Sequence, residues 1–187
     1  SITCTAPGMA GSCGFADIVV KHSDDGQSGT GSKLFAYVSS GVAWAAPVDH
    51  PVGNYPRRVV AVDLNGDGKI DLASANQLGN SVTVRLGAGD GTFPMPQSST
   101  LTLGGGTSPN DLLAADLNGD GKMDLATANS GGGGSITVLL NTGSGFAPTM
   151  ISTSSGGFSS GGAIAAGDLN GDTKIDLVVA SSSSSSV

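Results

Sequence analysis

The sequence predicts an all-β protein made of four-stranded repeats of about 53 residues. Three observations predict it: an acidic motif that occurs three times at nearly constant spacing, short apolar segments on both sides of each copy, and an acidic composition that consists of Asp alone. Asp favours turns and loops, whereas Glu, which the chain lacks, favours helices.

The acidic motif is nine residues long and is almost unchanged between its copies. It reads DLNGDGKID at Asp63–Asp71, DLNGDGKMD at Asp116–Asp124 and DLNGDTKID at Asp168–Asp176. The copies start 53 and then 52 residues apart, so the repeating unit is far longer than the motif. A fixed period of this size indicates a propeller or a repeat array.

Each motif lies between segments that have the character of strands. Runs of four to six mostly apolar residues precede it, within Gly53–Asp63, Gly106–Asp116 and Phe158–Asp168. Second apolar segments follow it at Leu72–Ala75, Leu125–Ala128 and Leu177–Ala180. Third segments with period-two alternation stand at Ser81–Gly87 and Ser135–Asn141. Glycine turns, Gly87–Phe93 and Asn141–Phe146, then lead into a looser fourth segment, which completes a unit the size of a propeller blade.

The first fifty residues contain the same unit without its beginning. Gly14–Val20 matches the segment around the last Asp of the motif, because Asp17 precedes Asp71 by 54 residues. Ser32–Ser40 and Val42–Pro47 correspond to the third and fourth strands. No carboxylate occurs in the stretch just before Asp17, so we expect no metal loop in this unit.

These boundaries divide the chain into six segments. They are an N-terminal segment (1–13), a partial first blade without a metal loop (14–52), a second repeat (53–105), a third repeat (106–157), a partial fourth repeat (158–180) and a Ser-rich tail (181–187). Closed propellers typically use four to eight blades. We therefore expect an incomplete propeller or an open array of blades within one chain.

The motif supplies the oxygen ligands that a hard cation such as Ca²⁺ requires. Side chains at positions 1, 3, 5 and 9 are assigned to the metal, and the lysine at position 7 contributes its backbone carbonyl while its ammonium group faces water. The assigned residues are Asp63, Asn65, Asp67, Lys69 and Asp71; Asp116, Asn118, Asp120, Lys122 and Asp124; and Asp168, Asn170, Asp172, Lys174 and Asp176.

The residue at position 6 of the motif predicts which of the three sites binds metal most weakly. Glycines at positions 4 and 6 permit the left-handed backbone that so tight a wrap requires. In the third copy Thr173 replaces the second of these glycines. A left-handed conformation costs a residue with a Cβ roughly 1–2 kcal/mol, so we expect the third site to be the weakest.

Two other calcium motifs are excluded, and one alternative remains open. An EF-hand requires a bidentate Glu at position 12, where this chain has Ser74, Thr127 and Val179. A dockerin-type module requires a helix after the loop, whereas short β-like segments follow here. The alternative is an Asp/Asn/Gly turn without metal, but three carboxylates within nine residues would repel one another if the loop stayed empty.

The three loops, the DLASAN and DLATAN segments that follow two of them, and the turn at Gly89–Phe93 resemble the FG-GAP-like or VCBS repeat, from about Gly14 to Ala180. In that family, which includes the integrin α-subunit head, the repeats form propeller blades. The resemblance implies that each Ca²⁺ loop connects the first two strands of a blade, which agrees with the strand pattern.

The composition indicates where the protein is located and which partners it is not expected to bind. Cys4 and Cys13 are the two cysteines; a disulfide between them would suit an extracellular setting, and two free buried thiols are the alternative. The formal net charge of −7 and the absence of a basic patch argue against nucleic acid. No run of about eighteen apolar residues occurs, so we expect no membrane span.

These observations predict an extracellular or cell-surface, Ca²⁺-stabilised structural or adhesive protein rather than an enzyme, because no catalytic set of residues is recognisable. Incomplete terminal blades leave strand edges that invite pairing, so we expect a homo-oligomeric ring or a filament. The alternative is a glycan- or protein-binding propeller module, a lectin or adhesin, that is a fragment of a longer chain.

Overall fold

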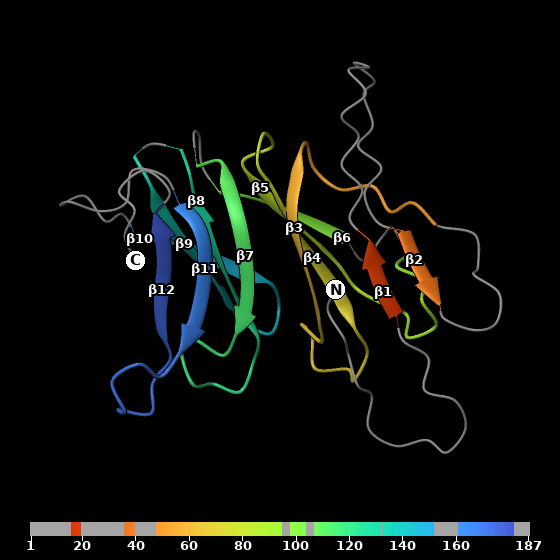
Figure 1. Cartoon of the computed structure of the whole chain (residues 1–187). Coiled ribbons are helices and arrows are strands. Elements are labelled where there is room, and N and C mark those ends of the chain that lie inside the picture. The colour runs from red at the N-terminus through yellow and green to blue at the C-terminus, as the bar shows by residue number, and fades with distance from the viewer. Residues whose placement is uncertain are drawn as a thin grey trace. The chain divides into compact units, whose positions relative to one another are not determined.

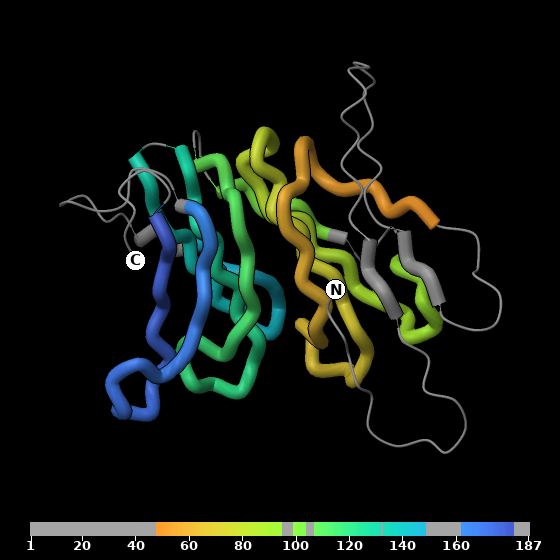
Figure 2. Tube along the Cα trace, in the orientation of Figure 1, coloured from red at the N-terminus to blue at the C-terminus, as the bar shows by residue number. Residues whose placement is uncertain are grey.

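The computed structural model describes residues 16–19, 36–39, 48–94, 98–103, 107–131, 133–151 and 161–181 (Figures 1 and 2). The chain divides into two compact units, 1–52 and 53–187. Every regular element in the described ranges is a β-strand, which confirms the predicted all-β class. None of these residues belongs to a helix long and apolar enough to cross a membrane.

The first unit contains one described pair of strands. β1 (Ala16–Val19) pairs antiparallel with β2 (Ala36–Ser39). Both fall within segments that the sequence assigns to the second and third strands of a blade. The predicted fourth segment, Val42–Pro47, and the predicted disulfide residues Cys4 and Cys13 lie outside the described residues.

The second unit contains two four-stranded antiparallel sheets and a two-stranded one. The first sheet consists of β3 (Pro56–Val62), β4 (Asp71–Asn76), β5 (Ser81–Arg85) and β6 (Ser98–Thr102), in that order. The second consists of β7 (Pro109–Ala115), β8 (Asp124–Asn129), β9 (Ser135–Asn141) and β10 (Phe146–Ile151). The third pairs β11 (Gly161–Gly167) with β12 (Asp176–Ser181). The two complete sheets confirm four strands per repeat.

The strand register is the same in all three sheets. Val60 lies opposite Ala73 in the first, Leu113 opposite Ala126 in the second and Ala165 opposite Val178 in the third. The first strand of each sheet has an irregularity near its start. In two sheets that strand begins with a proline, which cannot donate a ladder hydrogen bond. Equivalent positions in the repeats can therefore be compared directly.

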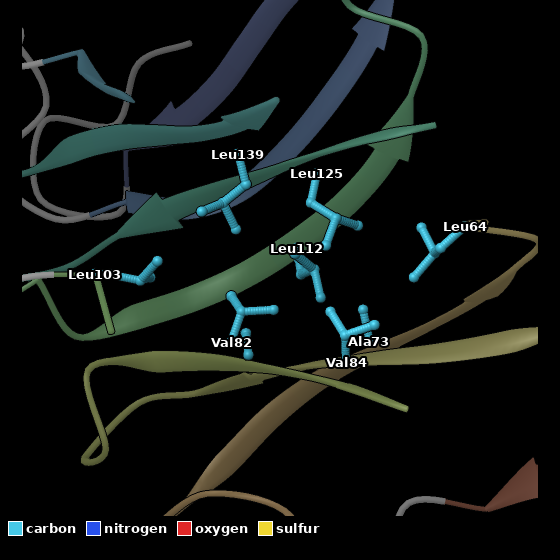
Figure 3. Close-up of a cluster of buried hydrophobic side chains, with 9 residues drawn as sticks. Leu64, Ala73, Val82, Val84, Leu103, Leu112, Leu125 and Leu139 are labelled. Atoms are coloured by element: carbon cyan, nitrogen blue, oxygen red, sulfur yellow. The ribbon is translucent and has the colours of Figure 1, made fainter. Parts of the chain in front are cut away.

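Neighbouring sheets of the second unit pack face to face, with β3, β7 and β11 following one another (Figure 1). We call the face that packs on the next sheet the forward face. Ala73, Val82 and Val84 on the forward face of the first sheet share one buried cluster with Leu112, Leu125 and Leu139 of the second (Figure 3). Fully burying one such leucine contributes about 1.5–3 kcal/mol, so these contacts dominate the cohesion between sheets.

Polar contacts also join neighbouring sheets. Arg58 Nε lies 3.2 Å from Asp111 Oδ1 across the first pair of sheets. The other carboxylate oxygen of Asp111 accepts a hydrogen bond of 2.9 Å from the backbone N–H of Ile164 in the third sheet. One side chain thus links all three sheets of the second unit.

Each four-stranded sheet contains a buried polar cluster centred on an asparagine. The Asn76 amide donates to Ser81 Oγ at 3.1 Å and to Thr83 Oγ1 at 3.0 Å, and its oxygen accepts from Ser74 at 2.7 Å. Asn129 makes the equivalent three bonds in the second sheet. Because every polar atom of these amides finds a partner, burying them is not costly.

Candidate cation-binding loops

The three acidic motifs form the loops between the first two strands of each sheet, as predicted. β3 ends at Val62 and β4 begins at Asp71, so the first loop fills the interval between them. The second and third loops occupy the same place in their sheets. Figure 2 shows all three at the same end of the strands, below the sheets in that view. The repeat therefore presents its acidic residues along one side of the second unit.

The first loop wraps around the carboxylate of Asp63. One oxygen accepts a hydrogen bond of 2.7 Å from the N–H of Gly66, and the other accepts one of 2.7 Å from Gly68. Both glycines adopt the predicted left-handed backbone, with φ of 78° and 80°. These conformations turn successive N–H groups inward, where the position-1 carboxylate receives them.

The other two loops repeat this arrangement, although the third does so with strain. Asp116 accepts hydrogen bonds from Gly119 and Gly121 at 2.8 Å each. In the third loop Asp168 accepts one of 2.9 Å from Thr173, which has a φ of 68°. Thr173 therefore adopts the left-handed conformation that the sequence predicts to be unfavourable. The N–H bond from Thr173 is the first cause of a lowered pKa of Asp168.

The oxygens at positions 3 and 5 lie on the exposed side of the loop. Asn65 Oδ1 accepts a hydrogen bond of 3.0 Å from the N–H of Asp67, and Asp67 Oδ1 accepts one of 2.9 Å from Lys69. The bond from the Lys69 N–H lowers the pKa of Asp67. The carboxylate therefore remains ionised well into the acid range, the state in which it can bind a cation.

The lysine side chain at position 7 is exposed in the first two loops, and its ammonium group also contacts the carboxylate at position 5. The Lys69 ammonium lies 3.4 Å from Asp67, and the Lys122 ammonium lies 2.9 Å from Asp120. The bond from Lys122 is the first cause of the lowered pKa of Asp120. In both loops the ammonium group acts as a local counter-ion for the position-5 carboxylate.

The aspartate at position 9 lies in a different environment from the other three side chains. Asp71 is 0% exposed, and its two oxygens accept hydrogen bonds of 2.8 Å from the N–H groups of Leu64 and Gly87. Asp124 is buried in the same way in the second sheet. This carboxylate fastens the start of the loop to the end of the third strand. A carboxylate offers about four lone-pair sites, so two remain after these bonds.

The donor chemistry of the loops fits a hard cation, although the side chains are not gathered around a common point. Among the described residues no group of three or more His, Cys, Asp or Glu side chains forms a metal-ligand cluster. In each loop, however, two carboxylates and one amide oxygen lie within five residues, at positions 1, 3 and 5. Oxygen donors of this kind are what Ca²⁺ prefers. Each carboxylate oxygen that accepts one N–H bond keeps a second lone-pair site with which it could bind a cation.

Two residues near the loops make hydrogen bonds that the sequence analysis did not anticipate. Asp90, in the turn after β5, accepts hydrogen bonds of 2.9 Å and 2.6 Å from the N–H and hydroxyl of Thr92, and the hydroxyl bond is the first cause of its lowered pKa. Asn141 donates to the carbonyl of Leu64 at 2.6 Å and to that of Met123 at 3.1 Å. Gly87 stands at the position of the first repeat that is equivalent to Asn141. This difference between the repeats is the only feature of the sequence that points to the contacts of Asn141.

Comparison with known proteins supports the repeat. The sequence model of the FG-GAP-like repeat matches residues 63–127 and again residues 116–179. The two matches overlap across the second loop and together span all three loops. No curated protein and no solved structure matches the chain.

Proposed function

The chain belongs to the FG-GAP-like repeat family, and from this premise we propose that it is an extracellular, non-catalytic structural or adhesive protein whose three acidic loops bind Ca²⁺. Repeats of this family are typical of extracellular and surface proteins.

One observation carries the calcium proposal: the same loop, with the same hydrogen bonds around its position-1 carboxylate, connects the first two strands of three successive sheets. Nine of the fifteen acidic residues lie in these loops. Bound Ca²⁺ supplies the positive charge that offsets their mutual repulsion. The chain's own contribution is to fix the loop backbone, so that few dihedral angles remain to be ordered on binding.

A cation that binds only the folded state stabilises that state by mass action. At a free concentration about 100 times its dissociation constant, one site adds about 2.7 kcal/mol to the free energy of unfolding. Calcium is plentiful outside cells, so loops of this kind provide dependable stabilisation there. Because each loop joins two strands of one sheet, cation binding would stabilise all three sheets of the second unit.

Thermal unfolding tests this proposal. We expect the unfolding midpoint to rise with Ca²⁺ concentration and to fall in a chelator, and we expect Mg²⁺ to be less effective because it demands near-ideal octahedral geometry. Asp67→Ala should reduce the Ca²⁺-dependent rise, whereas Asp49→Ala, at an exposed aspartate outside the loops, should leave it unchanged. Equal midpoints in Ca²⁺ and in chelator would refute the calcium proposal.

We also propose that the protein self-assembles into a ring or filament. The observation in favour is that the third sheet, in the described residues, has two strands where the first two sheets have four. Within those residues β12 pairs with β11 alone, and an unpaired strand edge is able to pair with a strand of another chain. Electron microscopy of the protein in Ca²⁺ should show rings or fibres that chelation disperses, and dispersed single particles in both conditions would exclude assembly.

A further inference from the structure

Asn141, at the end of β9, makes hydrogen bonds to both the first and the second acidic loop. Its side-chain amide donates to the carbonyl of Leu64 in the first loop at 2.6 Å and to the carbonyl of Met123 in the second loop at 3.1 Å. Its amide oxygen accepts the N–H of Gly143 at 3.0 Å. The residue is 5% exposed. Because both amide hydrogens and the oxygen are engaged, the side chain cannot rotate without breaking these bonds.

In the first loop the bond from Asn141 holds the peptide group between positions 2 and 3 of the motif. The carbonyl of this peptide belongs to Leu64 and accepts the amide of Asn141. Its N–H belongs to Asn65 and donates to Asp63 Oδ1 at 3.2 Å. The N–H of Leu64 itself donates to Asp71 at 2.8 Å. One bond from the second sheet therefore restrains the backbone that connects the proposed cation ligands of the first loop.

In the second loop Asn141 holds the peptide group between positions 8 and 9 and also the side chain at position 9. The carbonyl of Met123 accepts the side-chain amide of Asn141. The backbone N–H of Asn141 donates to Asp124 Oδ1 at 2.7 Å, and the other oxygen of this carboxylate accepts the N–H of Leu117 at 3.0 Å. Asn141 therefore contacts both the backbone and a proposed ligand of the second loop.

Within the described residues this link is confined to the first two loops. Gly87 takes the place of Asn141 in the first repeat, and its N–H donates to Asp71 at 2.8 Å, but it has no side chain with which to reach another loop. Leu169, which corresponds to Leu64 in the third loop, is 67% exposed, and none of the bonds of Asn141 reaches it. The third loop therefore serves as an internal reference for the other two.

We propose that Asn141 couples the first two loops, so that Ca²⁺ bound in one of them raises the affinity of the other. The proposal rests on the calcium function proposed above and adds how the sites depend on one another. A cation that binds one loop orders the backbone of that loop, and the bonds of Asn141 then restrict the backbone of the other. The second cation has less conformational freedom to remove, which makes the cooperativity positive. By linkage, each site affects the other by the same factor.

Site-resolved titration with Ca²⁺ by NMR tests this coupling. The amide signals of the glycines at position 4, each of which donates to the position-1 carboxylate, report on the three loops separately; they are Gly66, Gly119 and Gly171. An ionic strength of about 0.15 M screens repulsion between the bound ions.

Variants that disable one loop at a time reveal the coupling. Asp120→Ala changes an exposed side chain of the second loop that takes no part in the bonds of Asn141. It should lower the Ca²⁺ affinity of the first loop about fivefold, at the lower end of the usual coupling between sites. Asp67→Ala should lower the affinity of the second loop by the same factor. Asp172→Ala, in the third loop, should change neither affinity.

Variants at Asn141 show whether this residue carries the coupling. In an Asn141→Ala background, Asp120→Ala should leave the affinity of the first loop unchanged. Asn141→Gly, which places here the residue found at the equivalent position of the first repeat, serves as a second variant without the link. Ser144→Ala, at an exposed position in the next turn, is the matched control and should keep the wild-type coupling.

Hydrogen exchange at the Leu64 amide provides a readout that a merely structural role of Asn141 would not change. In Asp67→Ala, where the first loop is disabled, Ca²⁺ bound in the second loop should still slow this exchange. Addition of Asn141→Ala should abolish the slowing.

Circular dichroism establishes that each variant is folded. Comparison of Asp67→Ala with Asp120→Ala needs no change at Asn141, so loops that fill independently in these proteins would overturn the coupling and leave the calcium proposal standing. Coupling of undiminished size in the Asn141 variants would overturn the role of this residue. Absence of Ca²⁺ binding to the folded wild-type protein would overturn both proposals.

Discussion

Asn141 of β9 donates a hydrogen bond from its side-chain amide to the backbone carbonyl of Leu64, 77 residues earlier in the chain, with an N–O distance of 2.6 Å. The backbone N–H of Asn141 donates at 2.7 Å to Asp124, the last residue of the second loop. A single residue therefore joins the first acidic loop to the second. The equivalent residue of the first sheet is Gly87, where a Cβ would lie only 2.1 Å from the carbonyl oxygen of Ile70.

The first prediction concerns this link. Asn141→Ala should lower the free energy of unfolding by about 1–3 kcal/mol, because the buried Leu64 carbonyl loses its partner. Urea denaturation in a chelator measures the effect without any contribution from metal. Ser144→Ala, at an exposed position in the next turn, serves as the control and should change stability by less than about 0.5 kcal/mol. Equal stability of the two variants would show that the link contributes nothing.

The second prediction separates the buried aspartate from the exposed one. Asp71→Asn should destabilise the metal-free protein by about 2 kcal/mol, since an amide cannot accept both backbone N–H bonds that the carboxylate accepts. Asp67→Asn makes the same chemical change at an exposed position and should be nearly neutral in chelator. Denaturation curves of both variants, in chelator and in Ca²⁺, provide the comparison. A neutral Asp71→Asn would contradict its role as a fastener of the loop.

The third prediction concerns strain in the third loop. Thr173→Gly should stabilise the protein by about 1 kcal/mol and tighten cation binding there, because glycine adopts a φ of 68° without a Cβ penalty. Gly121→Thr makes the reverse change in the second loop and should weaken it by a similar amount. Thermal midpoints and Ca²⁺ titrations of both variants check the sign. A destabilising Thr173→Gly would mean that the hydrogen bond from Thr173 Oγ1 to the carbonyl of Asp172, at 2.6 Å, outweighs the strain.

The fourth prediction compares the two partners of an ion pair between sheets. Asp111→Ala should cost about 1–3 kcal/mol, since this side chain also accepts the N–H of Ile164. Arg58→Ala should cost less than about 1 kcal/mol, because its side chain is 50% exposed and an exposed ion pair contributes little. Chemical denaturation at low and high salt tests both: the Arg58 effect should shrink in high salt, whereas most of the Asp111 effect should remain, because the hydrogen bond from Ile164 is not screened. Similar costs for the two variants would contradict the bridging role of Asp111.

Much of the fold could be predicted because the repeat shows the same local signals several times. The spacing of Asp63 and Asp116 gave the period, and the apolar segments around them gave the strands and their order. Glycine at positions 4 and 6 predicted left-handed backbone, and Thr173 follows it as well. These are local properties, which a sequence records directly.

The rest depends on which residues meet in space. The sequence grouped Asp71 with the other proposed ligands and gave no sign that its carboxylate is buried and accepts the N–H of Gly87, 16 residues later. The link from Asn141 to Leu64 and the exposure of Leu169 follow from how sheets pack on one another. Three nearly identical loops can therefore have different surroundings, because neighbouring sheets rather than loop residues decide what is covered.

The central claim is that the three acidic loops bind Ca²⁺, and isothermal titration calorimetry of the chelator-stripped protein tests it most directly. The account predicts saturable Ca²⁺ binding with a stoichiometry of about three, reduced by one in each of Asp67→Ala, Asp120→Ala and Asp172→Ala, with the third loop binding most weakly. Wild-type protein that is folded by circular dichroism yet shows no saturable binding of Ca²⁺ would contradict it.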